Sequence, residues 1–290
     1  MIQSEEAKSL LSMLPELRHD LPFSPGLMHR LFAQTGFDSL ASLQDVAETI
    51  SKDQGLTTKI LAVANSAYYG LQARVSTVQR AAAVLGLSEV RTIVVAFGVR
   101  ALTQKFPVPK DFNLLQYWKH QLCVGTVAKE LARRAGNKEI SNLFTAGLLH
   151  DLGKLIIALY RPRQWQEIER LRIVKGLSPI KAEEQYWGLD HGIIGALVLK
   201  SWDFPPELYE PVNWHHSPLL AGVFSGDAAL LGMADVIARR IFDDIEDEAE
   251  AEQHIRKTCE QFGLDPVEIM AQASELLEDE SIDQVVHLLA

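Results

Sequence analysis

Apolar residues recur at intervals of three and four along nearly the whole chain, and the alternating pattern of a β-strand is hard to find anywhere. This periodicity predicts an all-α fold. The first part of the chain is expected to form separate helices that begin near Ser or Gly, over 24–35, 42–52, 55–65, 76–85 and 88–104. With 290 residues, 47% of them hydrophobic, the chain can bury a sizeable core and has room for about two domains.

Proline and charge divide the chain into three parts. The segment KFPVPKDFN, 105–113, holds two helix-breaking prolines, so we expect it to join a first lobe (1–105) to a second lobe (106–242). The stretch DDIEDEAEAEQ, 243–253, carries seven acidic residues, which is typical of a solvated helix face or a flexible joint. Residues 254–290 are expected to add two short amphipathic helices, so that 243–290 forms the third part.

Composition narrows the classes of function. No run of about 18 uncharged apolar residues is present, and the start MIQSEEAKSL lacks the pattern of a signal peptide, so we expect a cytoplasmic protein without a membrane span. Cys123 and Cys259 lie far apart, which argues against a disulfide framework and a thiolate metal site. A formal charge of −10 repels a phosphate backbone, so nucleic acid is the least favoured partner.

Polar groups on apolar helix faces are the most informative feature of the second lobe. The segment GLLHDLGKL places His150, Asp151 and Lys154 in an otherwise apolar run that reads as one buried helix. His120 shares a face with Val124, Val127 and Leu131 at helical spacing. In ALLGMADVIARRIF, Asp235 likewise shares the face of Leu231 and Ala238.

A buried, unpaired carboxylate or imidazole costs several kcal/mol, so each of these groups needs a hydrogen-bond partner, an opposite charge or a metal. Taken singly, each residue is best explained as a core group with its own hydrogen-bond partner. Because several helices contribute such groups, one shared site explains them more simply than a separate hydrogen-bond partner for each residue.

Two further segments add histidines to the same lobe. His191 begins the helix DHGIIGALVLKSW with Asp190 as its expected N-cap, and Gly192 and Gly195 allow another backbone to come close. A helix N-terminus is expected to keep the imidazole of His191 neutral, which is the form that ligates metal. NWHHSP supplies His215 and His216, a weak signal alone because neighbouring residues point in different directions.

Other aromatic motifs predict packing. The five tryptophans all fall in the second lobe and are assigned to its core: Trp118, Trp165, Trp187, Trp202 and Trp214. The segment ANSAYYG is expected to end a helix with Gly70 in the left-handed conformation, and to place Tyr68 and Tyr69 against the interface between the lobes.

With these motifs in view, the chain resembles the HDOD family, the bacterial signalling-output relatives of HD-domain phosphohydrolases. The resemblance covers about residues 15–240. In the first lobe it is carried by LPFSPGLMHRLF, ISKDQGLTTKILAVANSAYYGL and VSTVQRAAAVLGLSEVRTIV. In the second lobe, YWKHQLCVGTVAKELA, FTAGLLHDLGKLI, GLDHGIIGALVLKSW, NWHHSP and MADVIARRI are similar to the ligand helices of the HD superfamily. The resemblance implies an all-α domain whose output is mostly regulatory, and it implies that most members of the family do not hydrolyse a substrate.

The resemblance also implies a metal site. The superfamily's ligands would fall on His120, His150, Asp151 and Asp235, and related HD-GYP phosphodiesterases, which cleave cyclic di-GMP, add histidines matching His191, His215 and His216. Gln116 stands where those enzymes carry a glutamate, and no GYP element follows the histidine pair. Nitrogen and carboxylate ligands suit Fe, Mn, Zn or Ni, with one ion or two. Asp151 would bridge two ions. Lys154 would neutralise a phosphate oxygen, or else simply pair with Asp151.

Two functions follow from this reading. The favoured one is a cytoplasmic signalling module that interacts with signalling proteins or a small phosphorylated ligand, and whose HD-like lobe keeps metal ligands without turning over a substrate. The alternative is a metal-dependent phosphohydrolase or phosphodiesterase in which Asp151 and Lys154 act in catalysis. No motif in the sequence indicates an oligomeric state.

Overall fold

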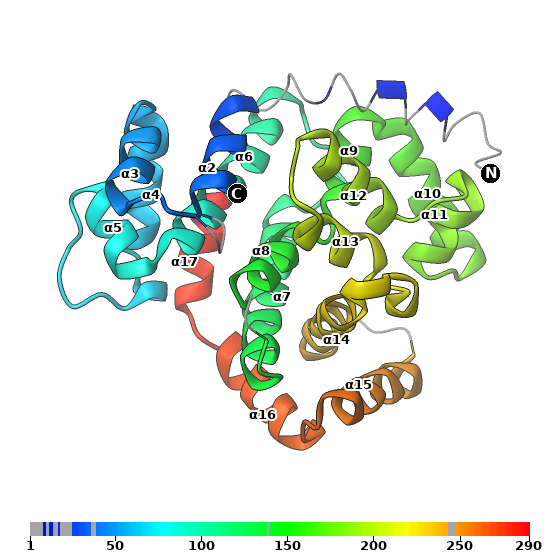
Figure 1. Cartoon of the computed structure of the whole chain (residues 1–290). Helices are drawn as coiled ribbons and strands as arrows, with labels where there is room; N and C mark the ends of the chain where they lie inside the picture. Colours follow the sequence, from blue (N-terminus) through cyan, green and yellow to red (C-terminus); the bar gives the residue numbers. More distant parts are fainter. Residues whose placement is uncertain are drawn as a thin grey trace.

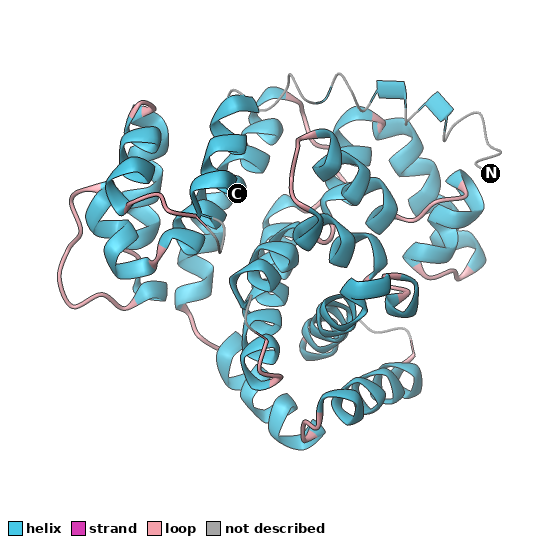
Figure 2. Cartoon of the chain, viewed as in Figure 1, coloured by secondary structure: helices cyan, strands magenta, loops and turns pink. Residues whose placement is uncertain are grey.

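The computed structural model describes residues 8–9, 12–13, 17, 25–35, 39–137, 140–242 and 247–290. Within these ranges the chain consists of α-helices, short 3₁₀ turns and loops, without a β-strand (Figures 1 and 2). The predicted all-α fold is therefore confirmed.

The first lobe lies at the left of Figure 1. Its elements are α2 (Pro25–Thr35), α3 (Leu43–Ser51), α4 (Gln54–Ala64), the 3₁₀ turn η1 (Ala67–Tyr69), α5 (Val78–Leu85) and α6 (Leu87–Lys105). They match the helices expected from the periodicity. Ser42 caps α3 as expected, whereas α4, α5 and α6 follow Asp53, Thr77 and Gly86 and not the expected Gly55, Ser76 and Ser88. Asp and Thr oxygens accept from first-turn N–H groups as serine does, so the caps differ without moving the helices.

The second lobe occupies the centre and right of Figure 1. Its helices are α7 (Leu114–Arg134), α8 (Ile140–Leu149), α9 (Leu152–Tyr160), α10 (Pro162–Lys175), α11 (Pro179–Trp187), α12 (His191–Ser201), α13 (Pro206–Trp214) and α14 (Ser225–Ile241). The 3₁₀ turns η2 (Pro218–Leu220) and η3 (Gly222–Phe224) precede α14. Helix α7 packs against α8 and α14, and α12 packs against α9 and α13, which brings the segments that carry the inward polar groups together.

The run from 140 to 160 is two helices, so the single helix expected there is wrong. Helix α8 ends at Leu149 and α9 begins at Leu152, with His150 and Asp151 in the turn between them. The imidazole Nδ1 of His150 lies 2.8 Å from the carbonyl oxygen of Gly147, which is the acceptor that the Asp151 N–H would use in a continuing helix. This contact between a side chain and the carbonyl of the preceding turn accompanies the break, and both polar side chains reach one site.

The C-terminal part contains three helices where two were expected. They are α15 (Glu248–Phe262), α16 (Pro266–Leu277) and α17 (Ser281–Leu289). Of the acidic stretch, 243–246 lie outside the described residues, Asp247 caps α15, and Glu248 and Glu250 lie on its exposed first turn. The solvated helix face is therefore the correct alternative for 247–253. Helix α17 returns to contact α6, α7 and η1, between the two lobes (Figure 1).

The segment ANSAYYG lies at the interface between the lobes, as expected. Gly70 has a φ of +54°. The Tyr68 hydroxyl lies 3.1 Å from the hydroxyl of Thr126 on α7, and the Tyr69 hydroxyl donates to Glu89 at 3.3 Å. These bonds join η1 to helices of both lobes. The division into 1–105, 106–242 and 243–290 stays our prediction for domain boundaries.

One segment, Asn142–Tyr160, passes a length and composition test for a membrane-crossing helix, but 89% of it is buried inside the protein. It also carries the charged groups of Asp151 and Lys154. Burial of this kind is the pattern of a core helix.

Candidate metal centre

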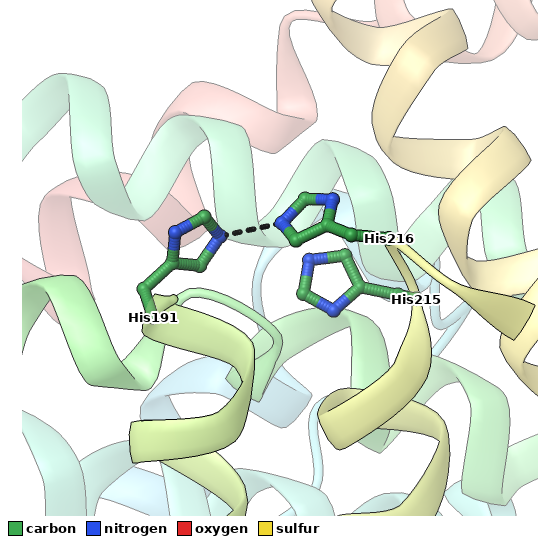
Figure 3. A group of neighbouring side chains, drawn as sticks. All are labelled: His191, His215 and His216. Atoms are coloured by element: carbon green, nitrogen blue, oxygen red, sulfur yellow. Dashed lines mark hydrogen bonds between the residues drawn. The ribbon is translucent and has the colours of Figure 1, made fainter. Parts of the chain in front are cut away.

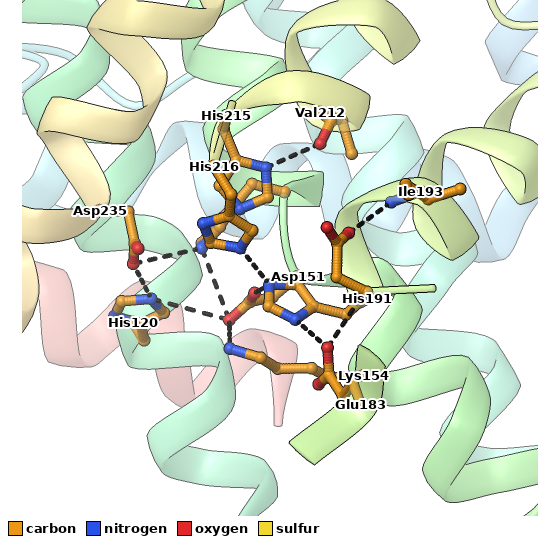
Figure 4. A network of polar contacts seen from close by, with 12 residues as sticks. His120, Asp151, Lys154, Glu183, His191, Ile193, Val212, His215, His216 and Asp235 are labelled. Atoms are coloured by element: carbon orange, nitrogen blue, oxygen red, sulfur yellow. Dashed lines mark hydrogen bonds and ion pairs between the residues drawn. The ribbon is translucent and has the colours of Figure 1, made fainter. Parts of the chain in front are cut away.

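All seven residues singled out by sequence lie together in the second lobe. Figure 4 labels each of them except His150. They come from α7, the turn between α8 and α9, the start of α12, the end of α13, and α14: His120, His150, Asp151, His191, His215, His216 and Asp235. Two groups of three have ligand atoms within 4.8 Å of one another. We call them the His120 position (His120, His150 and Asp235) and the His191 position (His191, His215 and His216).

Asp151 lies between these two positions. Its Oδ1 is 3.0 Å from Nε2 of His191, while its Oδ2 is 3.5 Å from Nε2 of His150 and 3.7 Å from Nε2 of His120. A further triad of ligand atoms within 4.8 Å joins Asp151 to His150 and His215. The two carboxylate oxygens therefore face different positions, which is the arrangement of a bridging ligand.

The spacing of the polar atoms matches neighbouring ligands of one ion. Nε2 of His120 is 3.1 Å from Oδ1 of Asp235, and Nε2 of His191 is 2.8 Å from Nε2 of His216 (Figure 3). Ligand atoms about 2.0–2.1 Å from an ion and about 90–110° apart are separated by about 2.9–3.4 Å. The observed separations lie close to this range.

The backbone fixes which nitrogen of two histidines faces the centre. Nδ1 of His150 lies 2.8 Å from the Gly147 carbonyl oxygen, and Nδ1 of His215 lies 2.7 Å from that of Val212. A carbonyl can only accept, so each Nδ1 carries the proton and each Nε2 presents a lone pair. Both Nε2 atoms are buried without a hydrogen-bond partner in the described part of the chain. Unpaired imidazole nitrogens aimed at carboxylates fit a divalent transition metal ion.

His191 is placed as predicted but is not neutral as predicted. Asp190 caps α12 by accepting from the Ile193 N–H at 2.9 Å. Burial opposes a charge on His191, yet the carboxylates of Glu183 and Asp151 outweigh it and raise its pKa to about 9. The nearby acids, and not the helix N-terminus, therefore decide its charge, and an ion at Nε2 would replace that proton.

The other pKa shifts favour the ligating forms. Burial alone would raise the pKa of Asp151, but the charges of Lys154 and His191 hold it well below its usual range. For Asp235, burial would likewise raise the pKa, but the hydrogen bond and charge of His120 hold it well below its usual range. Burial lowers the pKa of His215 to about 3, and that of His216 well below its usual value.

Adjacent positions in the sequence did not prevent His215 and His216 from sharing a site. Helix α13 ends at Trp214, so the two residues follow the helix and their rings lie 3.7 Å apart between centroids. Both rings are on the side that faces His191 (Figure 3). The reservation that neighbouring residues point in different directions applies within regular helices and does not hold at this helix end.

Glycines let the helices that carry these groups come close. A Cβ on Gly153 would lie 2.0 Å from the His191 carbonyl oxygen, and one on Gly232 would lie 2.3 Å from that of His215. A Cβ on Gly192 would lie 2.9 Å from the Val212 carbonyl oxygen, which confirms the close approach expected there. Gly153 and Gly232 were not identified from the sequence, because a lone glycine within a helix pattern does not reveal which backbone it meets.

A cleft of about 560 Å³ opens beside the centre. Lys154 reaches it and pairs with Asp151, with Nζ 2.9 Å from Oδ2, so the predicted ion pair is confirmed. Gln116 lies on its wall one turn before His120. Sequence reasoning missed other lining residues, among them Trp165, which it assigned to packing, and Glu183, a buried acid of α11 that contacts His191.

The comparisons with known proteins agree with this architecture. The HDOD domain profile matches residues 21–218. The chain belongs to the HDOD domain family. This confirms the resemblance read from the sequence, and it leaves Asp235 and helices α15 to α17 beyond the matched region.

Several solved structures resemble this HDOD protein. A protein of Shewanella amazonensis SB2B provisionally classed as a phosphohydrolase is 27% identical, with a TM-score of 0.75, and the match covers 97% of this chain and 98% of that one. An HDOD domain protein of unknown function from Geobacter sulfurreducens is 23% identical, with a TM-score of 0.71 and coverage of 93% and 98%. A protein of Marinobacter aquaeolei VT8 provisionally classed in signal transduction is 22% identical, with a TM-score of 0.77, covering 100% of this chain and 62% of that one. The Geobacter and Marinobacter proteins have the same fold as this chain.

A curated protein of Treponema pallidum (strain Nichols) is 24% identical over 176 residues, or 60% of this chain and 34% of that protein. The chain thus matches about a third of the length of this relative.

Proposed function

We propose that this HDOD protein binds one or two first-row transition metal ions in its second lobe and hydrolyses a phosphate ester held in the adjoining cleft. The observation that carries the proposal is the pair of buried Nε2 atoms on His150 and His215, which face Asp151 without a hydrogen-bond partner among the described residues. An unsatisfied buried polar group costs about 1–3 kcal/mol. Coordination of an ion would offset this cost.

The donor set also limits the kind of ion. Imidazole nitrogens with a few carboxylate oxygens suit Fe, Mn, Zn or Ni, whereas Ca²⁺ and Mg²⁺ prefer oxygen ligands alone. His120, His150 and Asp235 would hold one ion, and His191, His215 and His216 a second. Asp151 would contribute one oxygen to each.

The residues of the cleft are suited to phosphate-ester chemistry. A bound ion would polarise a phosphoryl group and lower the pKa of a water molecule at the site. Lys154, held beside Asp151 at 2.9 Å, would neutralise charge on a phosphate oxygen. Arg172 and Arg239 line the same cleft and add positive charge to its walls. The same cleft is also lined by five acids, Asp111, Asp151, Glu169, Glu183 and Asp235, so the bound ions would supply the excess positive charge that attracts an anionic ligand.

A regulatory role without turnover is the second candidate, and Gln116 favours it. This residue lies on the cleft wall one turn before His120 and offers a neutral amide, which is a poorer ligand for a hard cation than a carboxylate. In the regulatory candidate, the second lobe with its metal bound would bind a phosphorylated ligand or a signalling protein, and this binding would change the interactions of the protein. A cytoplasmic location suits both candidates.

Metal analysis and a general phosphodiester substrate test the proposal. Protein purified without chelator should contain about one to two equivalents of a first-row metal, and chelation should lower its melting temperature, because ligands from distant helices form no site in the unfolded chain. The loaded protein should hydrolyse bis(p-nitrophenyl) phosphate. A metal-free preparation whose melting temperature does not respond to Mn, Fe, Zn or Ni would refute both candidates, whereas metal without hydrolysis would favour the regulatory one.

We expect little or no hydrolysis of cyclic di-GMP. Gln116 replaces the expected glutamate, and the residues after His216 form η2 and η3 in place of a GYP element. Turnover of this dinucleotide should stay below ~1 per second, the low end of ordinary enzyme rates. Chromatographic analysis of the products measures it, and faster turnover that depends on His150 would contradict the expectation.

A further inference from the structure

Glu183 makes a double contact with one of the candidate ligands. It lies on α11 with only 3% of its surface exposed. Its Oε2 accepts from the backbone N–H of His191 at 2.8 Å and lies 2.7 Å from Nδ1 of the same residue. Figure 4 shows Glu183 on the side of the His191 ring away from His216. One carboxylate oxygen therefore holds both the main chain and the ring of His191.

Part of this contact has a purely structural explanation. His191 is the first residue of α12, where the backbone N–H has no acceptor within the helix. Asp190 already accepts from the N–H of Ile193, and a second carboxylate near the same helix end is also favourable. Capping accounts for the backbone bond but not for the bond to Nδ1. The ring bond has a separate consequence.

That consequence concerns the opposite nitrogen of the ring. With Nδ1–H donated to a carboxylate, Nε2 is the nitrogen left to ligate an ion once the ion displaces its proton, and it lies 2.8 Å from Nε2 of His216 and 3.0 Å from Oδ1 of Asp151. A carboxylate acceptor also makes the imidazole a better electron donor and restricts its rotation. His150 and His215 have backbone carbonyls in this role, so His191 alone among these three histidines depends on an acid from another helix.

We infer that Glu183 is a positioning residue for the His191 position, where it orients His191 and strengthens its Nε2 as a ligand. The inference rests on the proposed function for its metal, and it predicts which of two ions responds. Among the described residues, His120 and His150 face Asp235 and Asp151, whereas Glu183 contacts His191. The two positions should therefore respond differently to a change at residue 183.

Glu183 also connects this position to the cleft wall. Helix α11 packs against α10, and the two helices together line the cleft with Trp165, Arg172 and Glu183. Glu183 therefore contacts His191 and also lines the cleft.

Titration of Zn²⁺ into chelated full-length protein tests the inference. Glu183→Gln keeps the size and an acceptor oxygen but removes the charge, and it should weaken the Zn²⁺ affinity of one binding phase by about 10- to 100-fold while the other phase stays within about twofold. Glu184→Gln, the same change at the next, exposed residue, is the matched control and should leave both phases unchanged. Equal affinities in Glu183→Gln and wild type would overturn the inference, as would an equal loss in both phases.

A metal-independent measurement separates this inference from the proposed function. The hydrogen-bonded Nδ1–H of His191 should give a downfield proton resonance in chelated protein, assigned by its loss in His191→Gln, and Glu183→Gln should shift it while Glu184→Gln should not. If this resonance depends on Glu183 but no ion binds, the proposed function fails and the orienting contact stands. If ions bind and the resonance ignores Glu183, the positioning role fails alone. A fall in the melting temperature of Glu183→Gln with unchanged resonance and Zn²⁺ affinity would mean capping only.

Discussion

Replacing Asp151 with alanine is expected to strip the second lobe of bound metal and to abolish phosphate-ester hydrolysis. The oxygens of the Asp151 carboxylate face both candidate positions. Oδ1 lies 3.0 Å from Nε2 of His191, and Oδ2 lies 3.5 Å from Nε2 of His150. Loss of a residue that only orients a ligand lowers metal affinity about 10- to 100-fold, so loss of a bridging ligand should exceed ~100-fold. The variant also leaves Lys154 without this partner, so a lower stability of the chelated protein is expected as well.

Two variants separate loss of metal from loss of structure. Asp151→Asn keeps the shape of the side chain and removes its charge, so it should fold better than Asp151→Ala and still lose most of the metal. His287→Ala changes an exposed histidine of α17 and should keep the wild-type metal content. Metal content by mass spectrometry and melting temperature with and without chelator are the readouts. Wild-type metal content in Asp151→Ala would show that the ion lies elsewhere or that its ligands are the histidines alone.

Convergence of the site could be predicted because helical periodicity converts spacing into direction. His120 and Asp235 occupy apolar faces in the sequence, and the structure buries or half-buries both beside His150. Such groups cost several kcal/mol when left unpaired in a core, so they favour one shared site whatever the packing of the helices. Family resemblance then supplied the histidines at helix ends, where periodicity gives no direction.

Features that depend on contacts between distant segments were out of reach. The break at His150 coincides with a contact between its side chain and the Gly147 carbonyl, and an apolar run gives no sign of this contact. Glu183 reads as an ordinary acid on a polar helix, and only the packing of α11 beside the start of α12 gives it a role. The same holds for α17, whose sequence predicts an amphipathic helix but not its return to the first lobe.

Close backbone contacts form a further layer of the site that sequence does not reveal. Asp151 directly precedes α9, and His191 is the first residue of α12. Oδ1 of Asp151 lies 3.0 Å from Nε2 of His191, and this approach requires the two helix backbones to meet at glycines. A Cβ at Gly153 would stand 2.0 Å from the His191 carbonyl oxygen and 3.0 Å from the Gly195 backbone nitrogen. Rotation of a side chain cannot relieve either contact, because both neighbours are main-chain atoms.

Gly153→Ala should therefore lower the free energy of unfolding by about 3 kcal/mol or more, the upper end for overpacked cores, despite the ~1 kcal/mol that alanine gains over glycine in a helix. Gly226→Ala is the matched control, since Gly226 is also helical and its Cβ would meet only Phe262, at 3.6 Å. It should be neutral or slightly stabilising. Urea unfolding of chelated protein measures both without a contribution from metal. If Gly153→Ala unfolds at the wild-type urea concentration, α9 and α12 do not approach this closely. The short distance between Asp151 and His191, on which a shared ion depends, would then need another explanation.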